Sequence, residues 1–243
     1  MTGSSSARPL LAPSARPWAG ALLACCAILV AVLGVLFAHQ TRADGLDHAI
    51  DSRVIAGLGG HRGLLLWLAA PGSLIPAGVL CAVIVGACLL TGRLTGAVLA
   101  AAAVPVAVGL DELLLKPLVD RTYGGNLIYP SGHTTAVFAL AATVTVLLLV
   151  PPQPAKAAAW RVLIPVAACA LGAIVAIAVI GLQWHYFTDT VAGAAVAAGT
   201  VCGLALLLDR PTARRWLARP GRQPSAVRER QSHPSRADAG ASV

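Results

Sequence analysis

The sequence contains few charged and few aromatic residues. Only 12% of its 243 residues are Asp, Glu, Lys or Arg, and 5% are aromatic, whereas ordinary soluble domains carry about 25% charged residues. This composition argues against a water-soluble fold. Acidic residues are the scarcer kind, with 10 against 18 basic residues, which leaves a formal net charge of +8. The basic residues lie mostly in the two tails and in short loops between apolar runs, so membrane orientation explains the charge better than a nucleic-acid partner does.

Cysteine patterns typical of a disulfide framework or of a metal site are also missing. All six cysteines fall inside apolar runs, where cysteine behaves as a small hydrophobic residue. They are Cys25, Cys26, Cys81, Cys88, Cys169 and Cys202. The sequence therefore predicts no metal site.

Long apolar runs make up most of the remaining sequence. A helix needs about 20 apolar residues to cross the hydrocarbon core of a bilayer, and six runs approach or reach that length: residues 18–38, 73–90, 95–115, 133–150, 162–182 and 189–208. The sequence thus predicts an all-α polytopic membrane protein with six transmembrane helices in residues 18–209. Residues 39–72 are long enough to hold a helix at the interface. The polar ends, residues 1–17 and 210–243, are predicted to be disordered tails.

The distribution of basic residues predicts the orientation of these six spans. With six spans both tails lie on one side of the membrane, together with the loops that contain Arg93, Lys156 and Arg161. That side holds thirteen of the eighteen basic residues. Cytoplasmic loops carry the excess of Lys and Arg, so we expect both termini in the cytoplasm of a multi-pass protein of the cell membrane. The loops before spans four and six then face outwards.

The outward loop before span four has the residues of an anion site. Ser131 and Gly132 precede the predicted helix, where free backbone N–H groups and the helix dipole favour a negative charge. Lys116 and Arg121 lie on the same loop and can add charge-assisted hydrogen bonds to phosphate oxygens. His133 follows directly, so the loop predicts a phosphate site with a titratable group beside it.

A second polar cluster, QWHYFTD, stands between spans five and six. His185 and Asp189 are four residues apart and share a helix face if the helix begins there. Asp189 can then accept a proton from one ring nitrogen of His185, which makes the other nitrogen a stronger base or nucleophile.

These motifs resemble the type 2 phosphatidic acid phosphatase family, which is related to the vanadium haloperoxidases. The family pattern is a lysine followed after six residues by Arg-Pro, then Pro-Ser-Gly-His, then Ser-Arg with a His and an Asp downstream. Here the middle motif is complete in residues 130–133. His185 and Asp189 match the end of the third motif, and Lys116 matches the start of the first. The resemblance covers about residues 105–200.

The resemblance implies a phosphatase that acts on a membrane lipid phosphate without a metal or other cofactor. His185 would attack phosphorus, Asp189 would fix its tautomer, and His133 would protonate the leaving oxygen. Lys116, Arg121, Ser131 and Gly132 would hold the phosphoryl oxygens. The substrate would be a polyprenyl diphosphate, phosphatidic acid or a related lipid.

The sequence departs from the family pattern at two arginines. The first would stand at Tyr123, where Arg121 is the only nearby substitute, and the Ser-Arg pair falls on Ala178 and Val179. The alternative is therefore a degenerate family member, catalytically weak or inactive, that binds phospholipid or a partner protein. A small transporter is less favoured, because most spans lack ionisable residues almost entirely.

Overall fold

The computed structural model describes residues 9–149 and 158–213, and within them it confirms an all-α fold. The long helices are α1 (Arg16–Phe37), α4 (Leu74–Leu90), α5 (Leu94–Leu110), α7 (Gly132–Leu149), α8 (Ala158–Gly181) and α9 (Phe187–Leu208). Shorter elements are η1 (Pro13–Ala15), α2 (Gly45–Leu58), α3 (Arg62–Ala69), η2 (Ala70–Gly72), the π-helical turn η3 (Asp111–Leu115), α6 (Lys116–Val119) and the strands β1 (Thr122–Tyr123) and β2 (Asn126–Leu127).

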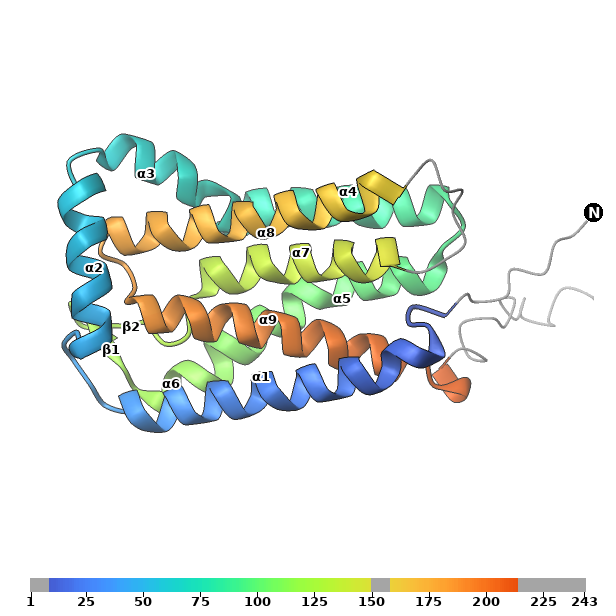
Figure 1. The fold of residues 1–243 in the computed structure, drawn as a ribbon, viewed down its shortest axis with the longest axis horizontal. Helices are drawn as coiled ribbons and strands as arrows, with labels where there is room; N and C mark the ends of the chain where they lie inside the picture. Colours follow the sequence, from blue (N-terminus) through green and yellow to red (C-terminus); the bar gives the residue numbers. More distant parts are fainter. Residues whose placement is uncertain (1–8, 150–157, 214–243) are drawn as a thin grey trace, which may run out of the picture.

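The long helices run side by side along the longest axis of the molecule (Figure 1). Helix α9 packs against α1, α5 and α7, and α7 also packs against α8. Small side chains permit this close packing, as on α9, where the fully buried positions include Ala192, Ala197, Val201 and Ala205. Helix backbones approach closely where residues are small, and van der Waals contact then holds the bundle together in lipid.

Several helices have the length and composition of membrane spans. Four described helices are long and apolar enough to cross a membrane, and the count rises to five if the bent pair Arg62–Gly72 and Leu74–Leu90 forms one span. The apolar segment Gly132–Leu148 of α7 is shorter. A polytopic membrane fold is therefore confirmed, and the number of six spans stays a prediction.

One end of the bundle is covered by the short elements. Helix α2 lies across this end, next to the β1–β2 hairpin and the turn between α8 and α9 (Figure 1). Helix α3 leads through η2 into α4 with a bend of 42°. Gly72 sits at this bend against α7, where an added Cβ would lie 2.7 Å from the backbone oxygen of His133. The absence of a side chain thus lets the bend approach the start of α7.

The prediction that residues 1–17 form a disordered tail is wrong for residues 9–17, which the structure describes. The backbone N–H groups of Leu10 and Leu11 donate to the carboxylate of Asp209 at 2.7 and 2.9 Å, and both leucine side chains are buried. Helix α1 begins at Arg16, whose guanidinium lies 3.6 Å from the same carboxylate. Residues 1–8 and 214–243, the rest of the predicted tails, lie outside the described residues.

Candidate active site

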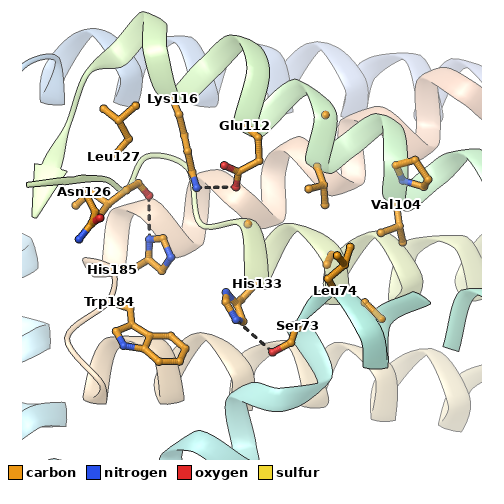
Figure 2. A pocket seen from close by; sticks show the side chains of 18 of the residues that line it. Ser73, Leu74, Val104, Glu112, Lys116, Asn126, Leu127, His133, Trp184 and His185 are labelled. Atoms are coloured by element: carbon orange, nitrogen blue, oxygen red, sulfur yellow. Dashed lines mark hydrogen bonds and ion pairs between the residues drawn. The ribbon is translucent and has the colours of Figure 1, made fainter. Parts of the chain in front are cut away.

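A large cavity opens where α7 begins, and it contains three of the predicted site side chains. Its volume is about 930 Å³, and its polar end is lined by Lys116, His133, His185 and the backbone of Gly132. Figure 2 shows Lys116, His133 and His185 directed into this space. The cavity continues between α4 and α5, along Leu74, Ala77, Val104 and Val108. It therefore joins a polar chamber to an apolar channel.

His185 is held in the tautomer that a nucleophile needs. Its Nδ1 lies 2.9 Å from the carbonyl oxygen of Ile128, and because a carbonyl only accepts, Nδ1 carries the proton and Nε2 keeps its lone pair. Burial, together with the positive charge of Lys116, lowers the pKa of His185 to about 3. The imidazole is therefore neutral at physiological pH and can attack an electrophile.

His133 stands at the first turn of α7, between two other side chains. Its Nε2 lies 3.5 Å from the hydroxyl of Ser73, and its ring centroid lies 5.4 Å from that of Trp184 at an interplanar angle of 47°. Both neighbours line the cavity (Figure 2). Ser73 and Trp184 thus restrict where the His133 ring can turn, and they leave it beside the space that His185 faces.

Lys116 and Glu112 form the ion pair that their spacing on the sequence predicts. Nζ of Lys116 donates to Oε1 of Glu112 at 2.6 Å, which holds the ammonium group at the cavity wall. Glu112 also approaches the start of α7, where a Cβ on Gly132 would meet its Oε1 at 2.9 Å. Glycine at position 132 therefore gives the carboxylate room beside the first turn of α7, whose first N–H groups have no intrahelical partners, as in any α-helix.

The prediction that Arg121 binds phosphate is not supported by its position. Its side chain is fully buried, and its two Nη atoms donate to Asp189 and to Asp47 at 2.6 Å each. The guanidinium lies 4.3 Å from the ring centroid of Phe37 and 4.5 Å from that of Tyr186. Two carboxylates and two aromatic rings thus surround the guanidinium of Arg121, and Arg121 does not line the cavity.

The predicted hydrogen bond between His185 and Asp189 is likewise not formed. One oxygen of Asp189 accepts from Arg121, and the other accepts from the backbone N–H of Tyr186 at 2.9 Å. This second bond belongs to the capping box at the start of α9, where a carboxylate satisfies free N–H groups. The carbonyl oxygen of Ile128 instead makes the hydrogen bond to His185 that was predicted for Asp189.

Ser131 is present at the start of α7 but is turned away from the cavity. It is fully buried, its hydroxyl accepts from Thr134 at 3.1 Å, and its N–H donates to the backbone oxygen of Asp189 at 3.0 Å. Ser131 therefore ties α7 to α9. Of the predicted phosphate ligands, Lys116 and Gly132 line the cavity, and Arg121 and Ser131 do not.

Sequence reasoning missed three contributors to the site. Asp47 on α2 also accepts from the Thr188 N–H and hydroxyl at 2.8 and 2.9 Å, and nothing in the sequence pairs it with a residue 141 positions away. Ser73 had a detectable signal, because a serine after Pro-Gly is typical of a helix start. The Ile128 carbonyl had no signal in the sequence, since every residue has a carbonyl group. Among the described residues, no group of three or more His, Cys, Asp or Glu side chains could hold a metal ion.

Two features define the class of this protein, namely a bundle of apolar helices and a chamber with two histidines and a lysine at one end of it. The family model of the PAP2 superfamily matches residues 82–214, which is more than half of the chain. The chain therefore belongs to the PAP2 superfamily, whose members are generally hydrolases of the phosphatase type. No curated protein and no solved structure matches it.

Proposed function

We propose that the protein is a membrane phosphatase that removes a phosphate group from a lipid through a phosphohistidine intermediate. The observation that carries this proposal is the shape and lining of the large cavity. Two imidazoles and an ammonium group stand at its polar end, and its other end runs between α4 and α5 with an apolar lining. A lipid phosphate such as phosphatidic acid or a polyprenyl diphosphate has the same division into a charged head and an apolar tail.

The first chemical step uses the free lone pair of His185. Nε2 attacks phosphorus, the bond between phosphorus and the lipid oxygen breaks, and that oxygen takes a proton from His133. The products of this step are a phosphorylated His185 and the lipid alcohol, or the lipid monophosphate if the substrate is a diphosphate. The neutral state of His185 at physiological pH, which follows from its lowered pKa of about 3, makes the lone pair available.

The second step returns the enzyme to its starting state. His133, now neutral, takes a proton from water as the water oxygen attacks phosphorus. The bond between phosphorus and Nε2 breaks, its electron pair returns to the imidazole, and inorganic phosphate is released. The Ile128 carbonyl keeps the ring in place through both steps by accepting from Nδ1 at 2.9 Å.

Fewer groups than the family pattern provides stabilise the negative charge on the phosphoryl oxygens. Lys116 supplies an ammonium group, and the first turn of α7 supplies N–H groups and the positive end of a helix dipole. Neither Tyr123 nor Val179 is basic, and Arg121 is taken up by two carboxylates. Because one preorganised donor is worth about a hundredfold in rate, we expect a slow enzyme.

Phosphate release by purified protein tests the proposal. The substrates are a polyprenyl diphosphate, phosphatidic acid and a phosphorylated sugar lipid, each with and without a divalent-metal chelator. Turnover that survives the chelator and is lost in His185→Ala is the expected result. His61→Ala is the matched control, because His61 is exposed and does not line the cavity. Equal activity of the wild type and His185→Ala contradicts the proposal.

The scarcity of cations around the cavity favours one second candidate, a protein that binds lipid phosphate without turnover. Under this alternative the wild type releases no phosphate from any of the three substrates, but it still binds phosphatidic acid in mixed micelles. Lys116→Gln then weakens that binding, because among the described residues Lys116 alone brings an ammonium group to the cavity lining.

A further inference from the structure

A second cavity lies on the other side of His185. Its volume is about 530 Å³, and Tyr123, Gln183 and His185 line both cavities. Most of the new wall comes from the segment before α2 and from α2 itself, with Arg42, His48 and Asp51. Ile180 and Tyr186 complete it. Arg42, His48 and Gln183 are exposed. This second cavity therefore connects His185 with water at the end of the bundle where α2 lies.

Arg42 supplies a positive charge and hydrogen-bond donors to the exposed part of this cavity. Within residues 9–149 and 158–213, Arg42 forms no ion pair, so its five N–H donors are available to a ligand. His48 stands on the adjacent face of α2, and Thr41 and Ser52 add hydroxyl groups. The planar fork of an arginine matches the oxygen geometry of phosphate.

Asp51 is the residue that indicates a ligand in this cavity. Its side chain is only 6% exposed, its Oδ1 accepts from the Phe187 N–H at 3.1 Å, and its Oδ2 has no partner. Burial, together with the nearby charge of Asp47, raises the pKa of Asp51 to about 6. The protonated carboxyl group can donate through Oδ2 to an anion, whereas an ionised one would repel it.

From this lining we propose that the second cavity binds inorganic phosphate through Arg42 and is the route by which the product leaves His185. This inference rests on the proposed function, because hydrolysis of a phosphohistidine yields phosphate at Nε2. The two products differ in where they are soluble. The lipid product returns along the apolar channel between α4 and α5, and phosphate passes Tyr123 and Gln183 into the cavity that faces water.

Binding of inorganic phosphate to the purified full chain in detergent, measured by titration calorimetry at pH 6, tests the site without turnover. Arg42→Gln should weaken binding about tenfold, which is the effect of losing one charge-assisted hydrogen bond. Asp51→Asn should tighten binding, because the amide keeps an acceptor for the Phe187 N–H and presents a donor in place of a negative charge. Arg53→Gln is the matched control, since Arg53 is an exposed arginine of α2 outside the cavity lining.

Two results would overturn the phosphate site, namely binding in Arg42→Gln equal to that of the wild type, or weaker binding in Asp51→Asn. The second result would indicate a ligand with hydroxyl or ammonium donors instead. Turnover of the wild type separates this inference from the proposed function. Arg42-dependent phosphate binding in a wild type that releases no phosphate from any of the three lipid substrates keeps the site and refutes the phosphatase. Turnover with no effect of Arg42→Gln on phosphate binding keeps the phosphatase and refutes the site.

Discussion

Replacement of Arg121 by lysine distinguishes a residue that holds the fold from one that binds substrate. The guanidinium donates to Asp47, Asp189 and Thr188 at 2.6, 2.6 and 2.8 Å, and the side chains of Arg121 and both acids are fully buried. A lysine keeps the charge but is a point donor without the planar fork that reaches both carboxylates at once. Arg121→Lys therefore leaves one buried carboxylate without a cation.

The size of the effect follows from the burial of the three charges. Removing one partner of a buried ion pair costs about 3–5 kcal/mol, and for proteins of 150–250 residues each kcal/mol lowers Tm by about 2–4 °C. We thus expect Arg121→Lys to lower Tm by roughly 6–20 °C. Thermal unfolding followed by tryptophan fluorescence in detergent measures this change. Arg53→Lys, the same substitution at an exposed position of α2, should leave Tm unchanged.

A different pattern would refute this reasoning. If Arg121→Lys kept the Tm of the wild type and instead raised KM for a lipid phosphate, Arg121 would contact the substrate. The buried ion pairs would then not be what holds α2 against the start of α9. Asp47→Asn provides a second check, because Asp47 lies on α2 and outside the cavity lining. It should lower Tm as well and leave KM unchanged.

Three further predictions concern other parts of the site. Val179→Arg, which restores a family residue, should prevent folding, because Val179 is fully buried in a hydrophobic cluster and an unpaired buried charge is costly; well-folded protein in size-exclusion chromatography would contradict this. Gly72→Ala should lower stability by about 1–3 kcal/mol through overpacking, since its Cβ would meet the His133 carbonyl oxygen at 2.7 Å. The check compares its Tm with that of Gly78→Ala, where no atom lies within 4 Å of the added Cβ. The pKa of His185 is lowered from 6.5 to about 3, so between these values the unfolded chain binds the extra proton and stability falls as pH falls. Tm should therefore drop more from pH 7 to pH 5 in the wild type than in His185→Gln, and equal drops would argue against a neutral imidazole in the folded protein.

The helices and the two histidine motifs could be predicted because their signals are local. An apolar run long enough to cross a bilayer forms a helix wherever it stands, and the predicted run at 189–208 differs from α9 (Phe187–Leu208) by two residues at one end. Likewise, the spacing of Glu112 and Lys116 is enough to predict their ion pair, which the structure confirms. Spacing of four along one helix face requires no knowledge of the rest of the chain.

The partners of the buried polar groups were decided by the tertiary structure alone. The same spacing of four predicts a pair of His185 and Asp189, but His185 precedes the first turn of α9, and Asp189 closes that turn by accepting from Tyr186. Arg121 then satisfies the other oxygen of Asp189, and Asp47 arrives from a helix 74 residues earlier to complete the ion pairs. A buried charge takes whichever partner the packing brings within reach, since the cost of leaving it unpaired exceeds any local preference. The sequence by itself identified the candidate site residues, and the packing of α2, the hairpin and α9 determined which of these candidates line the cavity.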